Sequence, residues 1–133
     1  MTGFATIEDV RDVVGLPDAE TLPDPKIQFQ LDSAKLKVNE LIGDYSAYTG
    51  DDKTRVTEAE CCFTAYYGLV SWNTFYTSSI ENFQTEVGES TAHFYSPEQL
   101  KNMKEEWKQR ALDRLNIFIN EDGTIKPIGW FAV

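Results

Sequence analysis

Apolar and polar residues alternate along this chain mainly with the period of an α-helix. In residues 25–42, apolar side chains fall within one arc at about 100° per residue, which predicts a helix that faces a core. Asp24 as N-cap and Pro25 at the first helical position mark its start, and Gly43 marks its end. The apolar stripe consists of Ile27, Leu31, Ala34, Val38, Leu41 and Ile42.

Two more large apolar residues lie on the opposite side of this predicted helix. Phe29 and Leu36 stand seven positions apart, among Asp32, Ser33 and Glu40. A single exposed apolar residue needs no explanation, but an aligned pair indicates a second contact surface.

A shorter helix is predicted near the N-terminus. Thr6 can cap the segment IEDVRDVV, with Glu8 and Asp9 near the positive end of the helix dipole and Gly15 as its end. The segment LPDAETLPD then reads as a loop.

A third helical pattern runs from about Thr57 to Phe75 and is apolar on two sides. A helix of this kind is usually buried on both sides, so we expect a central helix surrounded by the other helices or by a neighbouring subunit. Glu58 and Glu60 then fall in its first turn, where acidic residues serve the dipole. One stripe consists of Val56, Ala59, Phe63, Tyr66, Tyr67 and Val70, and the other of Cys61, Ala65, Leu69, Trp72 and Tyr76.

Residues 77–95 lack a helical period and predict a short hairpin or an ordered loop about Gly88. Ser96, Pro97 and Gln99 then form a capping box that starts a fourth helix. One side of this helix carries Leu100, Met103, Trp107, Ala111 and Phe118, and another carries Lys101, Lys104 and Lys108. The pattern fades near Ile119, and NEDGT reads as a turn.

The expected fold is therefore mostly α: a compact bundle of about four helices, with a small hairpin or ordered loop between helices three and four and an extended C-terminal arm. We divide the chain into a helical domain, residues 1–118, and an arm, residues 119–133. Chain ends are usually polar, yet this arm carries Ile125, Ile128, Trp130, Phe131 and Val133. The arm either folds back over its own helices or leaves the domain to dock elsewhere.

The chain is strongly acidic, with a net charge of −10 from 22 acidic and 12 basic residues. Proteins that grip nucleic acid by charge need a basic face, so this balance argues against tight DNA binding. The stretch 77–95 contains Glu81, Glu86 and Glu89 and no Lys or Arg. Because no apolar run reaches bilayer-spanning length and the N-terminus is not of the secretory type, we expect a protein that folds in a cytoplasm without membrane contact.

Candidate catalytic chemistry is sparse. Cys61 and Cys62 are neighbours, too close at about 3.8 Å between Cα atoms for a usual disulfide, and are expected to be buried free thiols. His93 has no motif around it, and we expect it in a loop or at the surface. We therefore expect no enzyme activity, no metal and no cofactor.

The order of the segments resembles the head–tail connector, or adaptor, proteins of tailed bacteriophages, also called head-completion proteins. The resemblance rests on TIEDVRDVVGLP, a longer helix ending NELIG, the apolar TEAECCFTAYYGLVSW, an irregular Gly-containing stretch and FYSPEQLKNMKEEWKQRALDRL. It covers about residues 4–118 and depends on helix order and apolar pattern.

This resemblance implies a structural protein of the virion, assembled in the host cytoplasm. A dodecameric ring would sit beneath the portal protein, extend the DNA channel and provide the platform for a stopper or tail-completion protein. Phe29 and Leu36 would serve lateral subunit contact, and Glu81, Glu86 and Glu89 would face the channel, where DNA passes without specific binding. The arm residues would bind the portal or a neighbouring subunit.

Other functions stay open from the sequence. Another phage neck component, such as a stopper or tail-completion protein, is expected to be richer in strands. A small helical metal-dependent enzyme would need a deep pocket with paired carboxylates or His93. A cellular regulator that binds a partner helix has no supporting motif.

Overall fold

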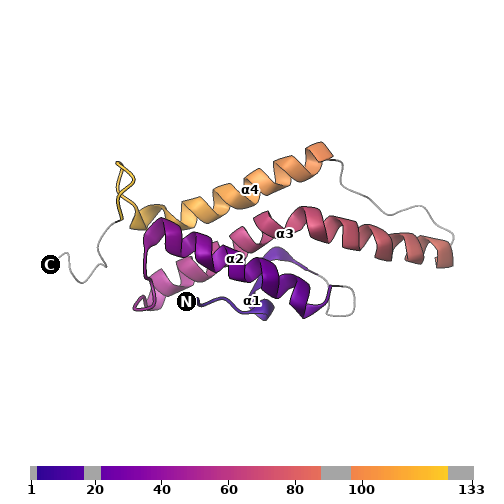
Figure 1. Ribbon diagram of the computed structural model, residues 1–133, viewed down its shortest axis with the longest axis horizontal. Helices are drawn as coiled ribbons and strands as arrows, with labels where there is room; N and C mark the ends of the chain where they lie inside the picture. The colour runs from indigo at the N-terminus through magenta and orange to yellow at the C-terminus, as the bar shows by residue number, and fades with distance from the viewer. Residues whose placement is uncertain (1–2, 17–21, 88–96, 126–133) are drawn as a thin grey trace.

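The computed structural model of the chain describes residues 3–16, 22–87 and 97–125, without the side chains of 73–87. In this part the fold is mostly α, as predicted, and consists of four α-helices and one short 3-10 helix (Figure 1). These are α1 (Ile7–Val14), α2 (Asp24–Ile42), α3 (Gly50–Val87), α4 (Pro97–Leu115) and η1 (Asn116–Phe118).

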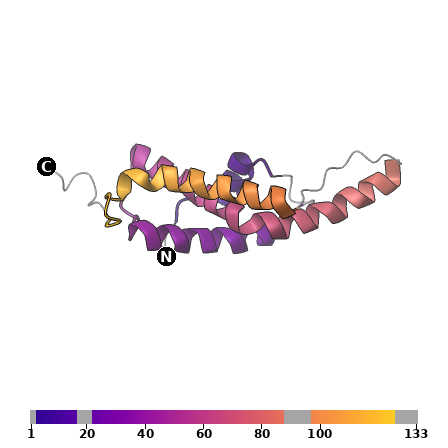
Figure 2. The same ribbon diagram turned by 90° about the horizontal axis from the view of Figure 1, so that it is seen from above.

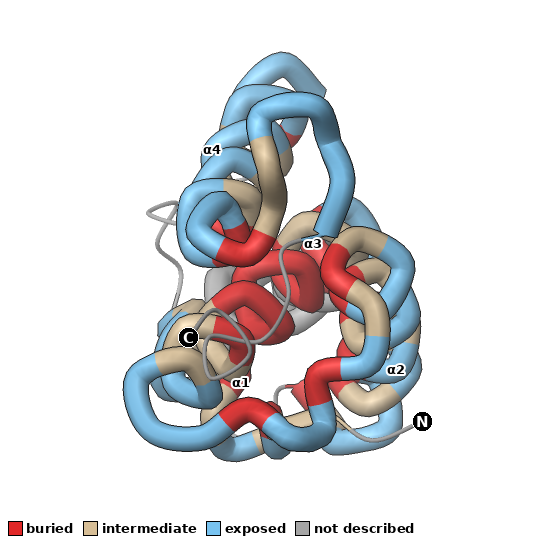
Figure 3. Tube along the Cα trace, turned by 90° about the vertical axis from the view of Figure 1, so that its left-hand side faces the viewer, coloured by how far each residue is buried: buried red, intermediate tan, exposed pale blue. Residues whose placement is uncertain are grey.

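The long helix α3 is the centre of the bundle, as its two-sided apolar pattern predicts. It contacts α1, α2 and α4, and Figure 3 shows its buried turns between these three helices. Its 38 residues make it about 57 Å long at about 1.5 Å per residue. Its C-terminal part extends beyond α2 in both Figure 1 and Figure 2.

Two clusters of buried side chains lie on different sides of α3. The larger, between α2, α3 and α4, consists of Ala34, Val38, Ile42, Tyr45, Tyr48, Val56, Ala59, Cys62, Phe63, Ala111, Leu115 and Phe118. The smaller, toward α1, consists of Ala5, Val10, Leu22, Ile27, Leu31, Cys61 and Trp72. The predicted stripes are wrong at Val70, which is half-exposed, and Leu41, Tyr66 and Tyr67 are only partly buried.

The predicted ends of α1 are confirmed. Thr6 Oγ1 accepts a hydrogen bond from the Asp9 backbone N–H at 3.2 Å, and the Thr6 N–H donates to Asp9 Oδ2 at 2.9 Å, which completes a capping box. Gly15 ends the helix with φ = 76°, a left-handed conformation that favours glycine.

At the start of α2 the predicted cap is wrong by one residue. Pro23 is the N-cap, and Asp24 is the first helical residue. The Asp24 carboxylate instead forms an ion pair at 2.6 Å with Arg11, which also donates to the Leu22 carbonyl at 2.8 Å. This pairing ties the end of α1 to the start of α2. Gly43 ends α2 as predicted, with φ = 75°.

The bounds predicted for α3 are too narrow, and the hairpin or loop predicted for 77–95 is wrong as far as Val87, where the chain is helical. No Gly or Pro lies between Gly68 and Gly88, so a helix that has already formed can continue at little cost without an apolar stripe. At the other end, Asp51 and Asp52 occupy the first turn. Residues 88–96, with Glu89 and His93, lie outside the described residues.

The chain after α4 forms the predicted turn. The Asn120 N–H donates to the Thr124 carbonyl at 2.7 Å, and Ile119 and Ile125 form an isolated antiparallel bridge. Ile125 is 45% exposed and lies beside the end of α2, since a Cβ added at Gly43 would be 3.4 Å from its Cδ1 atom. The remaining predicted arm residues, Ile128, Trp130, Phe131 and Val133, lie outside the described residues.

Candidate functional site

One side of α2 carries the most exposed large apolar side chains of the described chain. Phe29 is 71% exposed and Leu36 is 61% exposed, whereas the inward stripe of the same helix is almost completely buried. Asp32 and Glu40 are exposed on the same side. We call this side the outer face of α2; it consists of Phe29, Asp32, Ser33, Leu36 and Glu40.

The outer face is already partly ordered by local hydrogen bonds. Gln28 Nε2 donates to Asp32 Oδ1 at 2.7 Å, and Ser33 Oγ donates to the Phe29 carbonyl at 3.4 Å. Phe29 and Leu36 therefore lie on a segment that is ordered by hydrogen bonds within α2 itself. The sequence prediction that Phe29 and Leu36 avoid the core is confirmed, while their lateral subunit contact stays a prediction.

A second surface feature lies between α3 and the first turns of α4. It is a groove of about 410 Å³ whose lining combines apolar side chains with two lysines and a glutamate. Lys104 Nζ lies 5.0 Å from the centroid of the Tyr66 ring, and Lys108 Nζ lies 6.0 Å from it, both in cation–π contact. We call it the lysine-edged groove; it is lined by Tyr66, Val70, Pro97, Leu100, Lys101, Lys104 and Glu105.

The sequence found these lysines but not their contact. It placed Lys101, Lys104 and Lys108 on a separate polar side of the fourth helix. Their long apolar stems allow the charges of Lys104 and Lys108 to reach back over Tyr66 of α3. Helical spacing shows which residues share one helix face, but it does not show which residue of another helix they meet.

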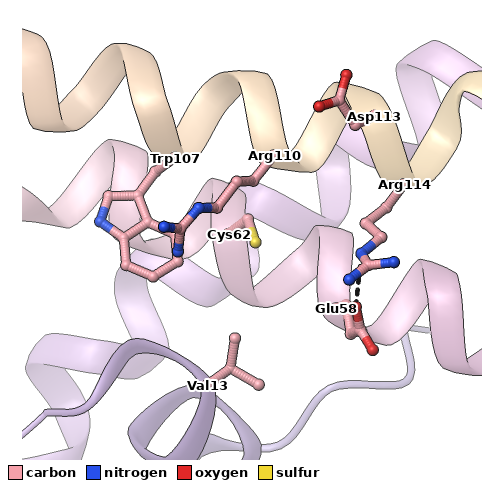
Figure 4. A pocket seen from close by; sticks show the side chains of 7 residues that line it. All are labelled: Val13, Glu58, Cys62, Trp107, Arg110, Asp113 and Arg114. Carbon is pink, nitrogen blue, oxygen red and sulfur yellow. Dashed lines mark ion pairs between the residues drawn. The ribbon is translucent and has the colours of Figure 1, made fainter.

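A third feature, which we call the arginine groove, has a volume of about 370 Å³ and lies where α1 and α4 approach α3 (Figure 4). Arg114 Nε pairs with Glu58 Oε2 at 2.6 Å, and the Arg110 guanidinium lies 4.7 Å from the centroid of Trp107. Both arginines are therefore engaged by neighbouring side chains. The groove is lined by Val13, Glu58, Cys62, Trp107, Arg110, Asp113 and Arg114.

Neither buried thiol is activated, whether Cys62 at this groove or Cys61 in the smaller cluster. Burial raises the pKa of Cys62 to about 11 and that of Cys61 to about 12, so both are protonated at neutral pH. Both are buried and free, as predicted. Glu58 does not lie in the first turn of its helix, contrary to expectation, because α3 begins at Gly50.

Glu60 was also expected in that first turn, but it is a fully buried carboxylate. Its Oε1 accepts from the Phe4 N–H at 3.0 Å, and its Oε2 accepts from the Ala5 N–H at 3.4 Å. Burial raises its pKa, while these two hydrogen bonds and the charge of Lys35 act in the opposite direction. Glu60 thus anchors the extended segment before α1 to the central helix.

The Tyr45 hydroxyl is buried beside this carboxylate and makes no hydrogen bond of acceptable geometry. Burial, followed by the charge of Glu60, raises the pKa of Tyr45, so the phenol stays protonated. The Phe4 ring packs edge-on against Tyr45 at 5.4 Å between centroids. No sequence pattern indicated this cluster, because Phe4, Tyr45 and Glu60 come from three separate segments.

The predicted channel-facing acids are not brought together by anything the structure describes. Glu81 and Glu86 belong to α3, but their side chains lie outside the described residues, as does all of Glu89. No group of three or more His, Cys, Asp or Glu side chains in the described ranges could hold a metal ion. Among the described helices, none has both the length and the apolarity needed to cross a bilayer.

Comparisons with protein-family models, with curated protein sequences and with solved structures give no match.

Proposed function

We propose that this chain is a head–tail connector of a tailed bacteriophage, a structural protein that forms a ring under the portal. The observation that carries the proposal is the outer face of α2, where Phe29 and Leu36 are 71% and 61% exposed on a helix whose other face is buried. A monomer gains nothing from this exposure, whereas a subunit that packs against its neighbours does.

The architecture supports the same proposal. Stopper and tail-completion proteins are expected to be richer in strands, and the described fold is mostly helical, which favours the connector over these neck components. The order of helices on which the resemblance rests is the order α1, α2, α3 and α4.

The charge of the chain suits a channel wall. With a net charge of −10, the ring would repel DNA and let it slide, rather than bind its phosphates. Glu81, Glu86 and Glu89 are the proposed channel-facing residues. No nucleic-acid specificity and no cofactor are required for this role.

The C-terminal arm would connect the ring to the portal or to a neighbouring subunit. Trp130 and Phe131 would serve as aromatic anchors, supported by Ile125, Ile128 and Val133. Ile125, the last described residue of the arm, lies beside Gly43 at the end of α2 of its own domain.

Electron microscopy of the portal ring encoded by the same genome, mixed with this protein, tests the proposal. Full-length protein and a version ending at Asn120 are compared, with circular dichroism to verify that both fold. A ring on the portal with the full-length chain, lost on truncation, supports both the connector and the arm. A ring with both versions removes the arm from the proposal, and no ring with either one rejects the connector.

A further inference from the structure

The C-terminal arm starts at one end of the helix that carries the outer face. Ile125, the last described residue of the arm, lies beside Gly43, since a Cβ added at Gly43 would be 3.4 Å from its Cδ1 atom. Figure 1 shows the turn before Ile125 at the same end of the bundle as the end of α2. Gly43 follows Leu36 by seven residues, as Leu36 follows Phe29. The arm therefore begins within reach of the two exposed apolar residues of α2.

The arm is long enough to run along the whole outer face. Eight residues, 126–133, follow Ile125 in the sequence and span up to about 26 Å at about 3.3 Å per extended residue. Along α2, Gly43 is 14 residues from Phe29, about 21 Å at about 1.5 Å per residue. An arm that runs back along α2 therefore passes Leu36 and reaches Phe29.

The apolar residues of the arm repeat at nearly the spacing of the outer face. Ile128 and Phe131 follow Ile125 at intervals of three residues. In a polyproline-type extended chain, which has three residues per turn, such residues share one side and are about 9.3 Å apart. Leu36 and Phe29 are about 10.5 Å apart along α2. The two arm residues can therefore meet Leu36 and Phe29 in that order.

Charge does not select what covers this face. Acidic and basic residues flank it together, namely Asp32, Glu40, Lys26 and Lys37. Within residues 126–133, Lys126 is the only charged side chain. The apolar part of the arm therefore brings no charge to the face, and chain length and apolar spacing identify the arm as its occupant.

We propose that the C-terminal arm folds back along α2 of its own chain and covers the outer face, with Ile128 against Leu36 and Phe131 against Phe29. The contact lies within one chain and requires no partner. In a connector, the arm hides the lateral contact face until the portal or a neighbouring subunit binds the arm. That regulatory role rests on the proposed function, whereas the contact itself does not.

Tethering makes this small contact effective. A short flexible tether gives a local concentration on the order of millimolar, so the arm meets its own α2 far more often than that of another chain in dilute solution. An aromatic side chain such as Phe131 buries roughly 150–250 Å², well below the 1,200–2,000 Å² or so of a stable interface between proteins. The contact therefore forms within one chain and is weak enough for a partner to displace.

Cross-linking within the full-length chain tests the contact. Ser33→Cys places a thiol on the outer face, and Gly129→Cys places one on the arm, so no apolar residue of the contact is lost. Ser33 is ten residues from Gly43, about 15 Å along α2. Gly129 is four residues from Ile125, about 13 Å along an extended chain. On the proposed path the two thiols therefore lie close together.

The double-cysteine chain is treated with a short bismaleimide at about 5 μM protein, far below the effective concentration of the tethered arm. The matched control carries the same two cysteines together with Phe29→Ser and Leu36→Ser, so its tether is unchanged while the apolar face is lost. Cys61 and Cys62 are buried, so the unmodified chain serves as the control that does not react. Circular dichroism verifies that each variant is folded.

We expect an intramolecular cross-link, identified by peptide mass mapping, at a yield at least about tenfold higher than in the control without the apolar face. Equal yields would overturn the proposal, because the tether alone would then explain the product. Little product in either chain would overturn it as well. Cross-linked dimers would show that the arm covers the face of another chain instead. Because no portal is present, these outcomes are independent of the portal-binding test of the connector.

Discussion

The two faces of α2 carry similar apolar residues in opposite environments. On the inner face, Leu31 and Val38 are at most 1% exposed, while Phe29 and Leu36 on the outer face are more than 60% exposed. The helix is the same, so helix propensity does not explain the difference. The inner residues are required by the fold, whereas the outer ones contribute almost nothing to it. Their exposure is the observation on which the proposed contact between subunits rests.

The same substitution on the two faces gives the largest expected contrast. Leu31→Ala removes buried side-chain volume from the cluster beside α1 and should lower the free energy of unfolding by about 2–5 kcal/mol. Leu36→Ala, seven residues from Phe29 on the exposed face, is the matched control and should change it by no more than about 0.5 kcal/mol. Urea unfolding followed by circular dichroism measures both. Equal losses would show that the outer face is also part of the core.

Where α2 packs against α3, replacing Gly68 with alanine should have an unusual effect on stability. A Cβ at Gly68 would lie 2.5 Å from the indole atoms of Trp72, which is buried and donates from Nε1 to the Lys26 carbonyl at 3.4 Å. Gly68→Ala should therefore destabilise the protein by about 1–3 kcal/mol through overpacking. In a helix interior without such a contact, alanine is more favourable than glycine by about 1 kcal/mol.

Ser71→Ala is the control for this substitution, since Ser71 is exposed one turn along the same helix. It should be neutral or slightly stabilising. Trp fluorescence reports whether the Trp72 ring has moved. A stabilising Gly68→Ala with an unchanged spectrum would contradict the close packing of Gly68 and Trp72.

Carboxylates inside and outside the bundle should differ in their response to pH. Burial raises the pKa of Glu60 above its ordinary value of 4.5, so the folded chain holds this proton over a range in which the unfolded chain has lost it. The contribution of Glu60 to stability is then complete below about pH 4.5 and declines as pH rises through the raised pKa.

Glu60→Gln should remove this decline, so wild type should lose stability relative to the variant between pH 4.5 and neutrality. Asp32→Asn, on the outer face, is the comparison at an exposed carboxylate and should change stability by no more than about 0.5 kcal/mol. Urea unfolding at several pH values measures the difference. Parallel pH profiles for wild type and Glu60→Gln would contradict a raised pKa at Glu60.

Local spacing was enough to predict the inner face of α2, the central place of α3, the cap of α1 at Thr6 and the start of α4. It failed for residues 77–87, where the helix continues without an apolar stripe. It also failed for Glu60, since a buried carboxylate near a predicted helix start looks like a dipole partner until the contact with Phe4 is known. The two grooves depend on contacts between distant segments, which spacing within one helix does not determine.

The proposal that the outer face of α2 assembles connector subunits is tested most directly on the portal itself. A chain with Phe29→Ser and Leu36→Ser is compared with wild type by electron microscopy of portal complexes, after urea unfolding has verified equal stability. The account predicts a complete ring with wild type and no ring, or isolated subunits, with the variant. A complete ring with both chains would contradict it.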